Sequence, residues 1–482
     1  MLKKIAARAF LSLIFFNQLI PFSSSSKAGL GNLQTLGKEK IFLSFNDLEK
    51  IILENNLQLQ NAKEDIKNAS YSLEASLSKY GLQVSLDSSI PQYTNGNDSI
   101  PGGELETSLL NTNATLTLNL PIFDPKKYPE IKSTKNKLTL AENAFEILKD
   151  DLNQEVSRRF FELQNANQEL INGTRSVNSS LLSLENAKSK FNNGIGNKLD
   201  LLDAKAQLAR DKQFLLDKKN SYQISKNALL QILNLDKEIE ISQRIEILGW
   251  WDHDLDKTLL STLQNRKRLK NILIKKSIED LEAEFALADS RPSFFLSNQL
   301  TRSYSSGESQ VTNVDSDSFS SSFENTVALK LNWNIFDSGL SRSNYKIKKS
   351  KAQKEIINYD LQKTLIIEEV KNVFESLKSS KEKVYISKSE LEASTEALKL
   401  SRLRFDNGIS SQGEVIDAQK DLTAARSRFA LNISRYNTNL QKIQNISKLD
   451  YSGICKNSNN NLYDLNDICS VDEPNENSQY EI

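Results

Sequence analysis

The chain has 482 residues, and its 62 Lys and Arg residues balance 62 Asp and Glu residues to a net charge of zero. This balance argues against a nucleic-acid-binding protein, which normally carries a clear excess of basic residues. Charged residues make up 26% of the chain, while there are 16 Gly and 8 Pro residues, and this composition suits long helices better than a large compact core.

The N-terminus has the pattern of a secretory signal peptide. Lys3, Lys4 and Arg8 precede an apolar run over residues 9–20, and small residues follow it. The run is shorter than the roughly 20 apolar residues of a transmembrane helix. We therefore expect residues 1–28 to be removed on export, with a retained interfacial anchor as the alternative.

A helix is expected to begin near Asp47, and two strands are expected at about residues 81–91 and 112–123. In the second strand apolar and polar residues alternate, namely Ala114, Leu116, Leu118, Leu120 and Ile122 with Thr115, Thr117 and Asn119. Such alternation predicts a strand with one apolar and one polar face. The polar stretch between the strands, PQYTNGNDSIPGGELETS, is expected to form a loop.

The segment from about residue 126 to residue 192 has an apolar residue at every seventh position. These residues are Val156, Leu163, Leu170, Val177, Leu184 and Phe191, and the spacing resumes at Leu201, Leu208, Leu215, Tyr222 and Leu229. A seven-residue apolar repeat packs against a partner helix in a left-handed coiled coil. At 1.5 Å per residue the first helix would be roughly 100 Å long, which argues against an ordinary globular bundle.

A turn at about residues 191–200 separates these two helices. Asn193 and Gly194 tolerate the left-handed conformation that ends a helix. Asn197 with Asp200 imitates the capping-box spacing that begins the next one. The sequence therefore predicts a hairpin tip between two long antiparallel helices.

The whole pattern occurs twice. KFNNGIGNKLDLLDAKAQL, which starts at Lys190, returns as RFDNGISSQGEVIDAQKDL, which starts at Arg404, and LNLPIFDP returns as LNWNIFDS. The expected organisation is a first repeat over residues 29–235, a linker over 236–253, a second repeat over 254–448 and an irregular acidic tail over 449–482.

In the second repeat a helix is expected to begin near Asp254, with strands at about 293–302 and 325–336. The polar stretch RSYSSGESQVTNVDSDSFSSSF is again expected to be a loop. The heptad positions are Val370, Leu377, Val384, Leu391, Leu398 and Phe405, then Val415, Leu422, Phe429, Tyr436 and Ile443. The second tip, at about 405–414, contains Asn407-Gly408 and a Ser411–Glu414 capping-box spacing.

Strands of about ten residues match the length of a tilted membrane strand. Four strands cannot close a membrane barrel, whose smallest examples have eight strands. Because open sheet edges are not tolerated in lipid, we expect the chain to oligomerise, with each copy contributing four strands. The alternative is a pair of hairpins on a soluble sheet.

The order of elements and the doubled F-x-N-G-I tip, each copy followed by Asp-Ala, resemble the TolC-like outer-membrane efflux channels over about residues 42–448. The resemblance implies a mainly α fold with membrane β, in which coiled-coil hairpins form an α-barrel across the periplasm. It also implies a homotrimer with a shared twelve-stranded β-barrel in the outer membrane, and no cofactor or enzymatic activity. The implied function is a passive exit channel for a tripartite efflux pump or type I secretion system.

The resemblance also implies partners and site residues. A periplasmic adaptor (membrane fusion protein) and an inner-membrane pump would supply the cargo, which could be a drug, a metal ion or a protein. The implied adaptor contacts are Asn193, Gly194, Ile195, Asn407, Gly408 and Ile409. The implied constriction of the periplasmic entrance consists of Asp417, Glu414, Asp200 and Asp203. Acids in the first turn of a helix are also favoured by the helix dipole, so capping is the alternative role. Phe405 and Ser410 stand where a tyrosine and an arginine of the family latch are expected.

Two other features have simpler interpretations. The single histidine, His253, lies in the linker sequence GWWDHDLDK without a metal-ligand or nucleophile pattern around it. Cys455 and Cys469 lie in the tail and could form a disulfide in an oxidising compartment. The competing functional interpretation is a periplasmic coiled-coil adaptor or scaffold protein without its own membrane barrel.

Overall fold

The computed structural model describes most of the chain, and the described residues are 40–101, 103–241, 245–311 and 314–453. The expected signal peptide and the cysteines Cys455 and Cys469 lie outside these ranges. Among the described residues, no helix combines the length and the apolar character required of a membrane-spanning helix.

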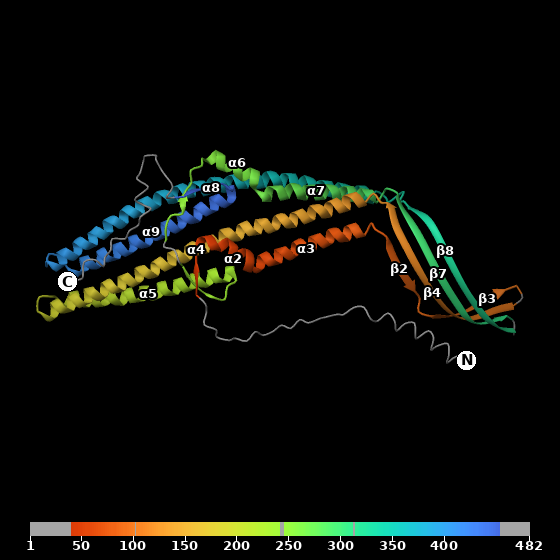
Figure 1. Ribbon diagram of the computed structural model, residues 1–482, viewed down its shortest axis with the longest axis horizontal. Helices are drawn as coiled ribbons and strands as arrows, with labels where there is room; N and C mark the ends of the chain where they lie inside the picture. The colour runs from red at the N-terminus through yellow and green to blue at the C-terminus, as the bar shows by residue number, and fades with distance from the viewer. Residues whose placement is uncertain (1–39, 102, 242–244, 312–313, 454–482) are drawn as a thin grey trace. The chain divides into compact units, whose positions relative to one another are not determined.

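Two long helical hairpins dominate the helical part. The first consists of α4 (Lys127–Asn192) and α5 (Lys198–Leu233), and the second of α8 (Leu340–Asp406) and α9 (Gln412–Ser447). In Figure 1, α4 lies along α5 and α8 lies along α9, and α4 of the first hairpin also packs against α9 of the second. The fold class predicted from the heptads is confirmed in these paired helices.

The heptad positions form the seam within each hairpin. In the second hairpin Val370, Val384, Leu422 and Ile443 are at most 1% exposed. Val370, Val384 and Ile443 share one apolar cluster with the heptad residues Phe429 and Tyr436, while Leu422 belongs to a second cluster with Leu398 and Val415. The seven-residue apolar spacing therefore corresponds to the contact between the helices of a hairpin.

The helix at the start of each repeat is interrupted, whereas the sequence predicted one continuous helix. After a short 3-10 turn, η1 (Phe45–Asp47), the first repeat has α2 (Leu48–Asn55) and α3 (Leu57–Ser78). The second repeat has α6 (Leu255–Asn265) and α7 (Lys267–Ala288). Asn56 is extended and accepts hydrogen bonds from the backbone N–H groups of the next helix, so it begins a new helix instead of continuing the old one.

The strands form one antiparallel sheet, whose members are β2 (Gln83–Ser88), β3 (Gln92–Ile100), β4 (Gly103–Phe123), β7 (Ser293–Val311) and β8 (Val314–Asn332). The order is β2-β4-β7-β8, and β3 pairs with β4 beyond the end of β2. The strands lie side by side in Figure 1. Among the described residues, the outer edges of β2 and β8 have no partner strand.

The register separates an apolar face of the sheet from a polar face. One row across the sheet consists of Leu86, Leu116, Leu300 and Asn325, and the adjacent row consists of Ser85, Thr117, Gln299 and Thr326. Because neighbouring residues on a strand point to opposite faces, these rows lie on opposite sides. Leu118 and Leu331 belong to the apolar face, as the alternation predicted.

The strands differ in length from those predicted. Both polar stretches expected to be loops consist mostly of strand, because the backbone ladder continues where the apolar alternation stops. Polar side chains also bond across the strands there; for example, Asn111 Nδ2 donates to Thr94 Oγ1 at 2.9 Å. By contrast, β8 ends at Asn332, so Trp333 to Phe336 are not in a strand, and Trp333 Nε1 donates to Ser290 O.

The linker and the start of the tail contain short strands that the sequence did not indicate. β1 (Lys40–Leu43) pairs with β5 (Glu238–Ile241), and β6 (Gly249–Trp250) pairs with β9 (Ser452–Gly453). Asn437 of α9 binds this linker through both ends of its amide, at Leu248 N and Glu246 O. His253 has a structural contact, since its Nε2 lies 3.0 Å from Asp450 O.

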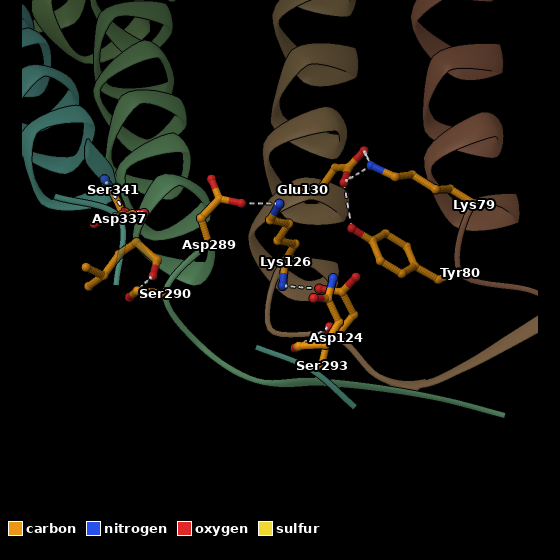
Figure 2. Close-up of polar contacts among 12 residues, drawn as sticks. Lys79, Tyr80, Asp124, Lys126, Glu130, Asp289, Ser290, Ser293, Asp337 and Ser341 are labelled. Atoms are coloured by element: carbon orange, nitrogen blue, oxygen red, sulfur yellow. Dashed lines mark hydrogen bonds and ion pairs between the residues drawn. The ribbon is translucent and has the colours of Figure 1, made fainter. Parts of the chain in front are cut away.

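The repeated Phe-Asp pair forms the junction between strand and long helix. Asp124 accepts a hydrogen bond from Lys126 N at 2.8 Å, and Asp337 accepts bonds from Gly339 N and Ser341 N at 2.9 and 2.8 Å. These carboxylates bind the free N–H groups at the helix start. In Figure 2, Asp337 lies against Ser341 in this way.

A second contact at this level links the short helices to α4. Tyr80 Oη donates to Glu130 Oε2 at 2.6 Å, and Lys79 Nζ lies 2.8 Å from the same oxygen, as Figure 2 shows. Burial raises the pKa of Tyr80, and the hydrogen bond to Glu130 raises it further. Lys126 forms an ion pair with Asp289 of the turn after α7. The helices of both repeats are thus tied together beside the sheet.

Glu282 of α7 provides a test of the packing between the repeats, because it pairs with Lys137 of α4 at 2.9 Å and with Lys348 of α8. Burial alone would raise the pKa of Glu282, but the hydrogen bonds and charges of the two lysines outweigh it and lower the pKa below its ordinary value of 4.5. The ionised carboxylate therefore stabilises the fold above the unfolded pKa, and this contribution is lost as pH falls through the lower folded pKa.

We expect Glu282→Gln to lower the free energy of unfolding at pH 7 by about 1 kcal/mol. The difference from the wild type should shrink below about pH 4, where the carboxyl of Glu282 in the wild type becomes protonated and loses its charge. Thermal melts followed by circular dichroism across this pH range would measure it. Glu64→Gln, at an exposed pair on α3, is the control and should have a smaller effect. A Glu282→Gln difference that does not change with pH would contradict the assignment.

Candidate functional site

The two hairpin tips have the same backbone structure. In the first tip, Gly194 N donates to Phe191 O at 3.1 Å and Ile195 N donates to Lys190 O at 3.0 Å. In the second tip, Gly408 N donates to Phe405 O and Ile409 N donates to Arg404 O, at 3.0 and 2.8 Å. This pair of bonds is the Schellman motif, which satisfies the last carbonyl groups of a helix.

Glycine is required in each tip by the backbone conformation. Gly194 has φ of 71° and Gly408 has φ of 72°, in the left-handed region. A Cβ atom at either position would meet no atom within 4 Å, so a side chain would be disfavoured by the dihedral angle and not by crowding. The predicted turns are confirmed, although Asn193 and Asn407 themselves have negative φ.

The tips expose the side chains that the resemblance assigns to adaptor contacts. Ile195 is 83% exposed and Ile409 is 69% exposed. Asn193 and Asn407 are also exposed, and the amide of Asn407 donates to Leu403 O at 2.7 Å. Each tip therefore presents one apolar side chain beside exposed backbone and amide groups.

The second tip places its acids in the first turns of α9. Glu414 Oε1 lies 3.3 Å from Arg404 Nε at the end of α8, while the exposed Asp417 lies 3.2 Å from Lys420. The capping box predicted for Ser411 and Glu414 is wrong, because Ser411 makes no side-chain cap bond. The carboxylate of Glu414 instead connects the two helices of its hairpin.

The corresponding acids of the first tip lie in the first turns of α5. Asp200 and Asp203 are partly exposed, and neither has an ion-pair partner within the described ranges. Asn197 is the N-cap residue, as predicted, and its side chain accepts from Leu199 N at 3.0 Å. Each chain thus carries two acids, three residues apart, at the start of the second helix of each hairpin.

A contact between the two tips was not predicted from the sequence. Lys190 Nζ lies 3.8 Å from the ring centroid of Phe405, donates to Phe405 O at 3.1 Å and lies 3.8 Å from Asp406. A cation over an aromatic ring is attracted by about 0.5–1 kcal/mol at an exposed site. The signal available in the sequence is that Lys190 and Arg404 are equivalent cations directly before the two tip aromatics.

The seam between the hairpins near the tips is polar. Ser179 Oγ donates to Gln419 Oε1 at 2.8 Å, Arg402 donates to Ser179 Oγ at 2.7 Å, and Ser176 and Thr423 hydroxyls lie 3.1 Å apart. The seam within the second hairpin at the same level is apolar and contains Leu398, Val415 and Leu422. The two kinds of contact therefore differ in chemistry over the same stretch of helix.

Comparisons with known proteins agree on one family and one fold. The family described as "Outer membrane efflux protein" matches residues 48–235 and 259–447. The solved structure of CusC is 16% identical, with a TM-score of 0.70 over 86% of this chain and 95% of CusC. A comparison with curated protein sequences finds no match.

Two further solved structures share the fold. The Campylobacter jejuni CmeC outer membrane channel is 16% identical, with a TM-score of 0.69 over 86% of this chain and 90% of CmeC. The outer membrane protein VceC from Vibrio cholerae is 15% identical, with a TM-score of 0.65 over 84% of this chain and 95% of VceC.

Substitution of the tip glycines tests the turn geometry. We expect Gly194→Ala and Gly408→Ala each to destabilise its tip by about 1–2 kcal/mol, because a side chain disfavours the left-handed conformation. Amide hydrogen exchange of the tip peptides should accelerate in both variants. Gly413→Ala is the control, since Gly413 lies in α9 without a positive φ and has room for a Cβ. Equal exchange in all three variants would contradict the requirement for glycine.

Proposed function

The chain belongs to the outer membrane efflux protein family, and we propose that it is the exit channel of a tripartite efflux pump or a type I secretion system. In this proposal it lies in the outer membrane with its helical hairpins in the periplasm. It would form a homotrimer and provide a passive duct, with no catalytic step of its own.

The observation that carries this proposal is the combination of an amphipathic sheet with two unpaired edges. The apolar row that contains Leu116 and Leu300 suits contact with lipid, and the polar row that contains Thr117 and Gln299 suits a water-filled lumen. Each chain would contribute four strand positions to a barrel, because β2 and β3 occupy one position beside β4, and β4, β7 and β8 occupy one each. Three copies would supply twelve positions and leave no strand edge unpaired in the membrane.

The acids near the tips support a charged periplasmic entrance. Asp417 and Glu414 of three copies would place six carboxylates around the entrance, and Asp200 and Asp203 would add six more. A ring of carboxylates favours the passage of cations over anions. Arg404 neutralises part of this charge, because it pairs with Glu414.

The two kinds of seam suggest how the entrance would open. The apolar heptad contacts within a hairpin would keep α8 and α9 together, whereas the polar contacts between hairpins can exchange with water at little cost. The hairpins would therefore separate from each other as intact units. Lys190 would have to leave the ring of Phe405 during this movement.

The exposed tips are the proposed contacts with a periplasmic adaptor. Ile195 and Ile409 would enter apolar recesses of the adaptor, while Asn193, Asn407 and the backbone at Gly194 and Gly408 would form hydrogen bonds. An inner-membrane pump would deliver the cargo through this assembly. Co-purification of the pump from native membranes would indicate the class of cargo.

The first test of the proposal is oligomeric state and membrane location. We expect the mature protein to remain in outer membranes after a carbonate wash and to be a trimer in detergent by native mass spectrometry. The physical reason is the need to pair the outer edges of β2 and β8. Release by carbonate as a monomer with its β structure intact would instead favour a periplasmic adaptor or scaffold.

The second test concerns the entrance acids. We expect Asp417→Ala combined with Glu414→Ala to raise single-channel conductance in planar bilayers and to weaken cation preference, because negative charge and bulk leave the entrance. Glu64→Ala, at an exposed pair on α3 away from the tips in the chain, is the control and should change neither property. Unchanged conductance and selectivity in the double variant would remove these residues from the entrance.

A further inference from the structure

Arg302 of β7 lies on the apolar face of the sheet. In the register it stands opposite Ala114 of β4 and Phe323 of β8. It is two residues from Leu300, which belongs to the apolar row described above, and every second residue of a strand points to the same side. Arg302 therefore shares the face proposed to contact lipid, where a charged side chain is unfavourable in a membrane barrel.

The guanidinium of Arg302 has no partner within the described ranges. The side chain is exposed, and it forms no hydrogen bond or ion pair with another described residue. Its neighbours on the same face are uncharged, namely Leu300 and Tyr304 along β7, Ala114 of β4, and Phe323 and Asn325 of β8. The nearby acid Glu324 lies on the opposite face, because its cross-strand partner is Thr301.

Assembly of several copies would not change the strands beside Arg302. β7 is an interior strand, with β4 on one side and β8 on the other. Further copies can pair only at the outer edges of β2 and β8, so the neighbours of Arg302 remain those of its own chain. Its positive charge therefore faces whatever surrounds the barrel.

The depth of Arg302 follows from strand geometry. The apolar face begins at Phe294, close to the junction with the helices, where Lys126 and Asp289 form the ion pair in Figure 2. Arg302 lies further along β7, at about 26 Å along the strand and about 20 Å along the membrane normal for a tilt of about 40°. The apolar band of such barrels is about 25 Å tall. Arg302 thus lies near the outward end of the band, from which a long side chain can extend its charge to the lipid headgroups.

Aromatic side chains occur at the same level. Tyr304 packs edge-on against Phe319 of β8, with ring centroids 5.2 Å apart. Phe319 and Phe323 are 67% and 68% exposed. Aromatic residues are enriched at the boundary between lipid tails and headgroups. The adjacent hydroxyl of Tyr304 and amide of Asn325 can donate further hydrogen bonds at this boundary.

We propose that Arg302 binds a phosphate group of a lipid in the outward-facing leaflet. A guanidinium forms two parallel, charge-assisted hydrogen bonds with a phosphate, and this pairing offsets the cost of placing an arginine on a lipid-facing surface. The acyl chains of the same lipid would cover the apolar rows between Arg302 and Phe294, a contact that a free phosphate ion cannot make. The inference rests on the proposed outer-membrane channel and adds a lipid-binding residue to it.

The test uses the full mature chain, purified as a trimer in detergent, with diphosphorylated lipid A as the probe and native mass spectrometry as the measurement. We expect Arg302→Gln to weaken binding of this lipid roughly tenfold, because charge-assisted hydrogen bonds are lost. Lys330→Gln is the matched control, since Lys330 lies opposite Phe295 on the polar face and its loss should leave binding unchanged. Equal binding by the wild type and Arg302→Gln, or equal losses in both variants, would overturn the inference.

Two further measurements identify the group that is bound. The same lipid without its phosphates should bind the wild type and Arg302→Gln equally, and inorganic phosphate at the concentration of the lipid should not displace the phosphorylated form. A difference that persists without the lipid phosphates, or displacement by inorganic phosphate, would overturn the assignment to a lipid phosphate.

The trimer mass and the circular dichroism spectrum of Arg302→Gln should match those of the wild type, which separates lost binding from lost folding. A wild-type trimer whose lipid binding does not depend on Arg302 would overturn this inference and leave the channel proposal intact. A monomeric wild-type protein would instead contradict the channel proposal itself.

Discussion

The proposed membrane channel depends on hydrogen bonding of the strand backbones at the two outer edges of the sheet, β2 and β8. Those N–H and C=O groups have no partner among the described residues, and a lipid environment offers them none. Strands of further copies would pair with these edges in the proposed trimer. The same edges would be costly in a single copy placed in lipid, which is why the proposed function requires an oligomer.

The helical part contains two kinds of contact, which differ in chemistry. Apolar heptad residues hold the helices of each hairpin together, while serine, threonine and glutamine side chains meet between hairpins near the tips. Separating apolar surfaces in water costs free energy, whereas hydroxyl groups that lose a protein partner can form hydrogen bonds with water instead. The hairpins are thus suited to act as rigid units, and the seam between them as the place where movement occurs.

The sequence predicted the features that have a local signal. The heptads, the tip glycines and the alternating part of β4 follow from a period or from one residue's conformational freedom. The polar ends of β7 and β8 were missed because a strand without apolar alternation resembles a loop. The break at Asn56 and the contact of Lys190 with Phe405 were missed because both depend on neighbours distant in the chain. The pairing of Glu414 with Arg404 was missed because the predicted capping box considered only residues at the start of α9, whereas Arg404 lies at the end of α8.

Arg404 determines how much of the charge of the proposed entrance is compensated. Its Nε lies 3.3 Å from Glu414 within the second hairpin, and Asp417 of the same tip lies 3.2 Å from Lys420. Both ion pairs would persist if the hairpins separated, because each pair lies within one hairpin. Asp200 and Asp203 of the first tip have no ion-pair partner among the described residues. The acids of the first tip would therefore carry most of the uncompensated negative charge at the entrance.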